Sequence, residues 1–412
     1  MDRVILHSDM NHFYAAVEEM RYPQLRDVPM AVGGSVDDRH GIILTKNDLA
    51  KKYKVKTGEA LWQARQKCPG LVIVPPHYDL YVKYSRLARE IYGRYTDLVE
   101  PYGMDECWLD VTGSTAIRGS GEKIANEIRE TIRSELGLTV SVGVSFNKIL
   151  AKLGSDMKKP DAVTVLDREH WRERVWPLAV SELLYVGWST TRRLTQAGIY
   201  TIGDLARTDP VLLKSWFGKR GLDLSVMARG DDRSRVMPQG FSAEAKSVGH
   251  GITCNADLTN EENVWRVILE LSQDIGRRLC LYGQCATGVE LWVRKSTLDG
   301  GGYQKRLGFK TQSPLEIAQA ARQLFDANYD WSKPVRQVTV RAINLVREDG
   351  PVQLSMFSDE DRRARRGQLE RSVIDIRRRF GDHAIRAACL LGDLHMPSDG
   401  RDEVVMPGMM YQ

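Results

Sequence analysis

The strand-like segments of this chain occur in two separate sets, and that separation constrains its architecture more than any other feature. Short apolar runs alternate with helical patterns over residues 1–165, and the same alternation returns over residues 246–346. Between them, residues 166–232 lack strand signals and fit short helices joined by glycines. Because a sheet must bury its apolar face against other elements, two sets of strands predict two α+β domains flanking a helical one.

The composition is that of an ordinary folded protein. Hydrophobic residues make up 42% and charged residues 27% of 412 residues, which excludes a wholly disordered chain. No run approaches the ~18 apolar residues of a membrane span, and the first apolar run is too short for a signal peptide, so we expect a cytoplasmic protein without a membrane partner. The six cysteines form no Cys-x-x-Cys pair, which favours reduced thiols. The net charge of +5 is compatible with nucleic acid without demonstrating it.

Three acidic residues lie where predicted strands end. Asp9 follows the apolar run at 4–6, and Asp105 and Glu106 lie between two strand-like pieces of the segment 99–111. If these strands are neighbours, three mutually repelling carboxylates converge on one sheet edge. Two Mg²⁺ ions prefer such oxygen ligands, and a pair of them clamps the attacking and leaving oxygens of a phosphoryl transfer. An isolated Asp-Glu pair is more often an ordinary turn, so the surrounding residues must decide.

Aromatic and basic residues accompany these acids. Phe13 and Tyr14 follow Asp9 by four and five positions, and a β-branched strand at 139–144 runs into a basic helix. Lysines there act as point charges that reach a triphosphate. The lysines of this region are Lys148, Lys152, Lys158 and Lys159.

Together these motifs resemble the Y-family translesion DNA polymerases, most closely the bacterial DNA polymerase IV branch. The resemblance covers residues 1–346, and the order and spacing of the motifs match that family. The matching segments are Ser8–Met10, Phe13–Glu18, Met104–Asp110, Ser141–Val144, Asn147–Lys148, Ala151–Lys152 and Lys158–Pro160. The resemblance implies an α+β multidomain fold, the right-hand polymerase. Its implied parts are the palm (1–10 and 77–165), fingers (11–76), helix-hairpin-helix thumb (166–232), linker (233–245), little finger (246–346) and C-terminal tail (347–412).

The resemblance also implies the roles of individual residues. Asp105 and Glu106 are the catalytic carboxylates, and with Asp9 and the backbone carbonyl of Met10 they hold two Mg²⁺ ions. Tyr14 is the steric gate, since a flat ring beneath C2′ of the sugar leaves no room for a ribonucleotide hydroxyl. The remaining residues assigned to nucleotide binding are Phe13, Thr45, Lys51 and Lys159, of which Phe13 is expected to be the buried one.

Four positions depart from the family pattern. The helix that meets the triphosphate usually carries Tyr and Arg three residues apart, but here the positions hold Asp48 and Lys51. Lysine keeps the charge and loses the bidentate fork of arginine, and an aspartate beside phosphates is repulsive. Gly103 stands where serine is usual, and Asn11 stands where an acid is usual. These differences place nucleotide affinity in question.

Two further segments indicate DNA binding. The segment 184–205 resembles a helix-hairpin-helix, in which Gly187 is retained while Tyr185 replaces the first glycine of the usual Gly-x-Gly turn. Backbone N–H groups at such a turn suit a DNA phosphate. Lys246 and Ser247 begin a segment that resembles the opening strand of the little finger, which lies along the duplex.

A short peptide in the tail resembles the bacterial sliding-clamp-binding motif. It consists of Gln353, Leu354, Ser355, Met356 and Phe357. Beyond it, residues 369–391 show helical apolar spacing, which fits either docking of a partner or packing back onto the chain.

We therefore predict a monomeric DNA-directed DNA polymerase of the translesion type. It would extend primer-template DNA with deoxynucleoside triphosphates, use two Mg²⁺ ions, bind a sliding clamp, copy with low fidelity and lack proofreading. A palm-type nucleotidyl cyclase also uses a carboxylate pair in a hairpin, but it predicts neither the hairpin DNA module nor the clamp peptide. A catalytically weak repair accessory bound to clamp and DNA is the alternative that Asp48 and Gly103 motivate.

Overall fold

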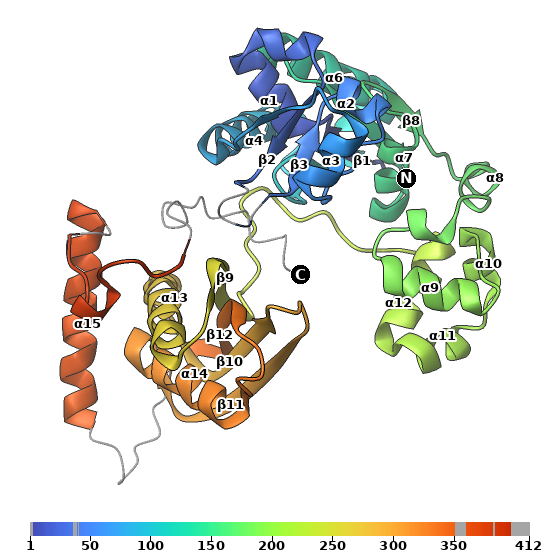
Figure 1. Ribbon diagram of the computed structural model, residues 1–412. Helices are drawn as coiled ribbons and strands as arrows, with labels where there is room; N and C mark the ends of the chain where they lie inside the picture. Colours follow the sequence, from blue (N-terminus) through green and yellow to red (C-terminus); the bar gives the residue numbers. More distant parts are fainter. Residues whose placement is uncertain (1–2, 36–38, 40, 351–359, 382–383, 397–412) are drawn as a thin grey trace. The chain divides into compact units, whose positions relative to one another are not determined.

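The strand that carries Asp9, β1 (Ile5–Met10), lies at the centre of a five-stranded sheet in the order β5-β6-β1-β7-β8 (Figure 1). All six of its residues are buried, as expected of an inner strand. Both neighbours run antiparallel to β1, whereas β7 and β8 are parallel. The other strands are β5 (Val99–Pro101), β6 (Glu106–Asp110), β7 (Val140–Ser145) and β8 (Val163–Val165).

The computed structural model describes residues 3–35, 39, 41–350, 360–381 and 384–396. By their contacts, the described parts of Met1–Gly33 and Ile42–Ala243 form one unit, and those of Gly34–Gly41 and Glu244–Glu403 form a second. In the part of the chain that is described, no helix is long and apolar enough to cross a membrane.

Helices cover both faces of the five-stranded sheet. Because successive residues of a strand point to opposite faces, Leu6 packs on α4 (Tyr78–Gly93) and α6 (Gly121–Leu136), whereas Ile5 faces α7 (Lys148–Met157). The isoleucines of α6 recur every four residues and are all fully buried, which is the pattern of an amphipathic helix. They are Ile124, Ile128 and Ile132.

A single glycine permits the close approach of α7 to the sheet. A Cβ atom on Gly143 of β7 would lie 1.9 Å from the carbonyl oxygen of Ala151 in α7, so no larger residue fits there. The same helix continues with Lys152, and the close packing therefore brings that lysine to the strand that carries Asp9.

A smaller three-stranded sheet, in the order β3-β2-β4, belongs to the same unit. Buried Asn47 joins its elements: the side-chain oxygen accepts from the N–H groups of Met30 (3.1 Å) and Ala50 (3.0 Å), and the amide donates to Glu19 and Val28. The strands are β2 (Met30–Gly33), β3 (Ile43–Lys46) and β4 (Val72–Val74), and the helices are α1 (Phe13–Arg21), η1 (Pro23–Asp27), α2 (Asp48–Lys52) and α3 (Leu61–Lys67).

The segment predicted to be helical forms a helical module with its own core. Two tight hairpins shape it, one before α9 and one between α11 and α12. A Cβ on Gly221 would lie 2.1 Å from the carbonyl oxygen of Leu213, so this glycine lets α12 pack directly on α11. The helices are α8 (Trp171–Val175), η3 (Val180–Glu182), α9 (Trp188–Gln196), α10 (Ile202–Arg207), α11 (Pro210–Phe217) and α12 (Lys219–Ala228).

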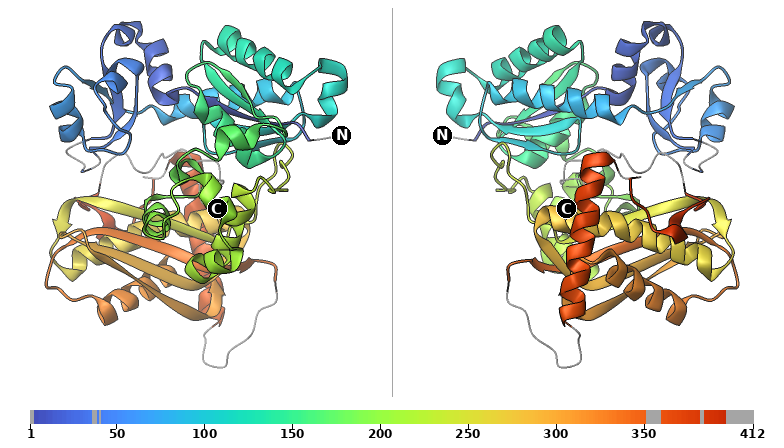
Figure 2. Two further views of the ribbon diagram at one scale, coloured as in Figure 1. Left: turned by 90° about the vertical axis from the view of Figure 1, so that its right-hand side faces the viewer. Right: turned by 90° about the vertical axis from the view of Figure 1, so that its left-hand side faces the viewer.

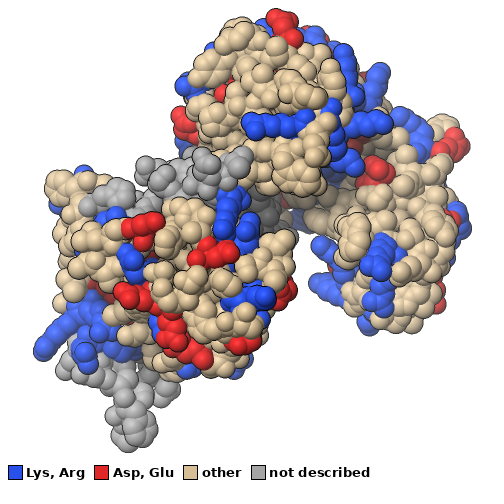
Figure 3. Space-filling model, viewed as in Figure 1, with Lys and Arg blue, Asp and Glu red and all other residues tan. Residues whose placement is uncertain are grey.

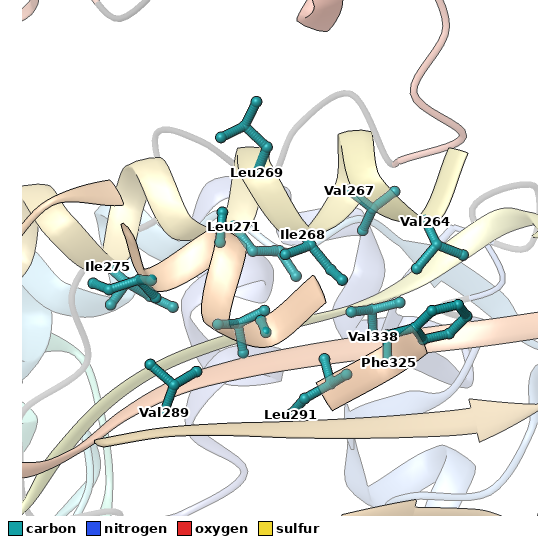
Figure 4. Packing of buried hydrophobic residues seen from close by; sticks show 14 of the residues in the cluster. Val264, Val267, Ile268, Leu269, Leu271, Ile275, Val289, Leu291, Phe325 and Val338 are labelled. Carbon is teal, nitrogen blue, oxygen red and sulfur yellow. The ribbon is translucent and has the colours of Figure 1, made fainter. Parts of the chain in front are cut away.

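The second unit contains a four-stranded antiparallel sheet in the order β11-β10-β12-β9. Its helices lie on one face of the sheet (Figure 2). Figure 4 shows the core, in which Ile268 and Ile275 point from α13 toward Val289 and Leu291. The elements are β9 (Ser247–Leu258), α13 (Glu261–Tyr282), β10 (Gln284–Lys295), β11 (Gly300–Thr311), α14 (Pro314–Asn328) and β12 (Val335–Arg347).

Strand β11 was not predicted from the sequence. It begins with three glycines, and most of its side chains are exposed or half-buried because it is an edge strand, so no apolar alternation marks it. Part of the segment with helical apolar spacing forms α15 (Glu360–Phe380), which is followed by η4 (Ala388–Leu390).

Candidate active site

The sheet register brings the three predicted carboxylates to one edge. Asp9 on β1 lies directly opposite Glu106 on β6, and Asp105 occupies the turn that precedes Glu106. The N–H of Met10 donates to the carbonyl oxygen of Asp105 at 2.9 Å, which ties the turn to the end of β1. The geometry expected from the strand pattern is therefore present.

Two lysines lie among these carboxylates. The Nζ atom of Lys152 is 3.0 Å from Glu106 and 3.4 Å from Asp9, and that of Lys159 is 2.7 Å from Asp9. Both lysines also contact Asp156, at 3.2 and 2.9 Å. Four acidic side chains and two ammonium groups thus share one partly buried site.

Sequence reasoning placed Lys152 near a triphosphate and gave it no part in the carboxylate cluster. Lys148, one helical turn earlier, carried the same signal, yet its Nζ lies 2.6 Å from Glu100 and above the ring of Trp108. Only the packing of α7 on the sheet distinguishes the two. Asp156 was also missed; its spacing of four residues from Lys152 is the available signal.

Burial and mutual repulsion perturb the acids. Burial, then Glu106 and then Asp9 raise the pKa of Asp105 to about 7. Burial and the charge of Glu106 also raise the pKa of Asp9. Without a further positive charge, the cluster therefore resists full ionisation.

The chemistry of these acidic side chains suits divalent cations. One carboxylate oxygen of Glu106, Oε2, is buried, lies 3.0 Å from the ammonium of Lys152 and faces Nε2 of His7 at 3.3 Å. The acids are hard oxygen donors that lack sufficient positive charge. Among the described residues, however, no three His, Cys, Asp or Glu side chains are already arranged around one ion position, because the lysines contact Asp9 and Glu106 instead.

His7 supports this edge from within the sheet. Its Nδ1 lies 2.8 Å from the hydroxyl of Ser155, and that hydroxyl donates to the carbonyl oxygen of Lys152 at 2.7 Å. The hydroxyl must therefore accept a hydrogen bond from Nδ1–H, so Nε2 of the neutral ring carries no proton. Burial first, and then the charge of Lys152, hold the pKa of His7 well below its usual value. A lone histidine on a strand gave no signal in the sequence.

The raised pKa of Asp105 predicts a pH-dependent stability. The folded chain holds this proton up to a pH of about 7, whereas the unfolded chain releases it near pH ~4, so the free energy of unfolding falls as pH rises between these values. We expect Asp105→Asn to raise the free energy of unfolding of the metal-free chain by about 1–3 kcal/mol at pH 8 and by less at pH 5. Urea denaturation in the presence of a chelator measures the free energy of unfolding at each pH. An equal gain in stability at both pH values would contradict the raised pKa of Asp105. Asp110→Asn is the control variant.

Tyr14 lies beside the acids at the start of α1. Its ring stacks on Tyr81, with centroids 4.2 Å apart and planes 10° apart, and Tyr81 donates to the buried carboxylate of Glu18 at 2.5 Å. Burial and the charge of Asp105 raise the pKa of Tyr14. Phe13 is 2% exposed and packs in the core, as expected. The ring of Tyr14 is thus held by a rigid stack.

The positions that depart from the family pattern have different explanations in the structure. Gly103 has φ of 84°, a conformation that side-chain-bearing residues rarely adopt, so the turn before Asp105 explains this glycine. Asp48 and Lys51 are exposed on α2, and Asp48 forms no ion pair with Lys51 or Lys52 within the described residues. Thr45 lies on β3, paired with β2.

The first hairpin of the helical module presents Gly187 as the N-cap of α9, with open space where a Cβ would stand. Tyr185 adopts φ of 71°, the conformation expected of the glycine it replaces, and Arg220 lies 4.5 Å from its ring centroid. Arg220 follows Gly218, which has φ of 62°. Gly218 and Gly221 were among the glycines expected to join the short helices of this segment, but a second hairpin was not predicted from them.

The remaining predicted residues lie elsewhere. Lys246 and Ser247 are exposed at the start of β9, in the second unit. The peptide Gln353–Phe357 lies outside the described residues.

Comparisons with known proteins decide the family. The impB/mucB/samB family profile matches residues 8–156, and the C-terminal domain of that family matches residues 245–356. A DNA polymerase IV of Acetivibrio thermocellus is 49% identical over 95% of this chain and 98% of its own length. The chain belongs to the Y family of DNA polymerases. Another Y-family member, a DNA polymerase IV of Clostridium acetobutylicum, is 35% identical over 95% of this chain and 99% of its own.

The Y-family fold is supported independently. The thumb domain of DNA polymerase-iota matches residues 182–232, the helical module with its two hairpins. A solved structure of a Y-family DNA polymerase chimera of Dbh and Dpo4 superposes with a TM-score of 0.73 and 23% identity, covering 83% of this chain and 99% of that one. The predicted resemblance and the multidomain α+β fold with a helix-hairpin-helix thumb are thereby confirmed.

Proposed function

We propose that the chain is a DNA-directed DNA polymerase of the translesion type. The observation that carries this proposal is the convergence of Asp9, Asp105 and Glu106 on one sheet edge beside the stacked ring of Tyr14. Primer-template DNA and deoxynucleoside triphosphates are the substrates, and the low fidelity and absence of proofreading belong to the same proposal. We keep the boundaries given above for palm, fingers, thumb, linker, little finger and tail, and we infer a cytoplasmic monomer.

Asp9, Asp105, Glu106 and the carbonyl oxygen of Met10 would hold two Mg²⁺ ions. The ions supply Lewis-acid stabilisation of the attacking and leaving oxygens when they are bound. Their charge would offset the burial and the repulsion from Glu106 and Asp9 that raise the pKa of Asp105.

The chain's own side chains bind and orient the nucleotide. Lys159, with Lys152 beside it and Lys51 from α2, would offset the charge of the triphosphate. Tyr14 would lie against the sugar and exclude the 2′-hydroxyl, with Phe13 packed behind it and Thr45 on the neighbouring strand β3. Asp48, at the start of α2, is exposed and forms no ion pair with the residues that the structure describes, which predicts weaker nucleotide binding than a Tyr and Arg pair gives.

Contacts to the DNA backbone would position the duplex without reading its sequence. The N–H groups at Gly187 suit a phosphate because the space around this residue is open. Lys246 and Ser247 at the exposed start of β9 would contribute from the second unit.

Primer extension tests this function. With Mg²⁺ and four deoxynucleotides, we expect extension by a few nucleotides at a time on an undamaged template and on one carrying a bulky guanine adduct. DNA binding without extension would instead support the catalytically weak accessory, the alternative that Asp48 favours.

The sliding clamp is the proposed partner of residues 353–357. We expect the double variant Leu354→Ala/Phe357→Ala to abolish clamp binding, because both apolar anchors of the peptide are lost, while clamp-free extension stays unchanged. Val352→Ala, just outside the motif, is the matched control. Surface plasmon resonance on immobilised clamp measures it, and unchanged affinity of the double variant would refute the motif.

A further inference from the structure

Helix α15 is held against the second unit by its polar face. Arg363 pairs with Glu316 at 2.9 Å and lies 3.9 Å above the ring centroid of Phe309. Glu370 accepts from the hydroxyl of Ser313 at 2.6 Å, about two turns further along.

The segment after α15 also packs against the second unit. Leu390 and Leu394 are buried in the core of the second unit, and Arg266 of α13 donates to the carbonyl oxygens of Cys389 and Leu391. The chain beyond the predicted clamp peptide therefore packs back onto the fold, and α15 is an anchored element.

Four apolar residues of α15 stay exposed or half-buried in this packing. Leu369 is 65% exposed, Ile376 37% and Phe380 74%, and Val373 between them is half-buried. Spacings of four, three and four residues place them on one face, in the a/d pattern of a helix-helix seam. We call these four residues the α15 stripe. If α15 only packed back onto the fold, these four residues would be buried.

The charge around the α15 stripe is positive. Arg362, Arg365 and Arg366 precede Leu369 by seven, four and three positions and so share its face. Asp375 is engaged by Arg378 and Arg379. Figure 3 shows Lys and Arg side chains gathered over the first half of α15, at the lower left.

We propose that the α15 stripe docks an amphipathic helix of a partner protein whose flanking residues are acidic. The apolar spacing matches a helix, and the arginines match carboxylates on its flanks. A second copy of this chain would bring like charges together, and DNA phosphates would leave the exposed leucine, isoleucine and phenylalanine unburied. This surface lies outside the residues assigned to polymerase chemistry and does not depend on that function.

The test uses two labelled synthetic peptides of about three heptads, with identical leucine seams and either glutamate or lysine flanks. Fluorescence anisotropy with the full chain should show binding of the glutamate peptide and not of the lysine peptide. Leu369→Ser/Ile376→Ser should weaken that binding about tenfold or more, and Arg365→Glu/Arg366→Glu should reverse the preference. Ile117→Ser, at a 90% exposed position of the first unit, should change nothing.

Several outcomes overturn the proposal. Equal binding of both peptides, or binding unaffected by the serine substitutions, would remove the docking site. Loss of DNA affinity in the arginine variant, with none in the serine variant, would assign the face to nucleic acid. A dimer that the serine variant dissolves would assign it to a second copy, and stronger peptide binding after deletion of residues 397–412 would assign it to the chain's own end. Primer extension should be unchanged in the serine variant, which separates this test from that of the polymerase function.

Discussion

Replacing Asp105 by Ala is expected to abolish primer extension while leaving DNA binding nearly intact. Asp105 lies in the turn between β5 and β6, immediately before Glu106, and this turn is tied to the end of β1 by the N–H of Met10. Its loss therefore removes a central member of the cluster proposed to hold two ions. We expect extension to fall by ~100-fold or more, which corresponds to about 3 kcal/mol of transition-state stabilisation. Single-turnover extension measures the rate, and anisotropy of a labelled primer-template measures the DNA affinity.

Asp110→Ala is the matched control. Asp110 is the last residue of β6, the strand that begins with Glu106, and its carboxylate accepts a hydrogen bond from Thr112 rather than contacting the cluster. This variant should keep its extension rate. If Asp105→Ala retains more than a few per cent of wild-type activity, the metal-site assignment is wrong. If DNA affinity falls equally, the variant has lost its fold and not its chemistry.

Replacing Tyr14 by Ala is expected to admit ribonucleotides. The ring of Tyr14 is held flat against Tyr81, whose hydroxyl donates to Glu18, so the proposed barrier to a 2′-hydroxyl would be rigid. Removing the ring should lower the discrimination between deoxynucleotides and ribonucleotides by about 100-fold, through the ratio of kcat/KM values for the two. Incorporation of a single matched nucleotide on an undamaged template measures it.

Tyr14→Phe separates the ring from its hydroxyl. If exclusion is steric, this variant keeps wild-type discrimination, because the ring and its stack on Tyr81 remain. Unchanged discrimination in Tyr14→Ala would show that another group rejects ribose. A rise in KM for both kinds of nucleotide, with their ratio unchanged, would indicate a general loss of binding.

Much of the first sheet could be predicted, because buried strands appear in the sequence as short apolar runs. The run before Asp9 and the two pieces around Asp105 and Glu106 are β1, β5 and β6. The sequence left open whether β1 and β6 are neighbours, and their pairing is what brings the acids to one edge. Strand β11 was not predicted, because this edge strand buries too few side chains to give a pattern of apolar residues in the sequence.

The sequence alone therefore determined the order of the elements, the family and the three acidic residues, because periodicity and motif spacing are local properties. Tertiary packing decided that Lys152 reaches the carboxylates while Lys148 binds Glu100, that Arg220 stacks on Tyr185, and that the α15 stripe faces outward. Each of these depends on which elements distant in the chain approach one another. Local patterns show which face of a helix is apolar, but only the packed fold decides what that face meets.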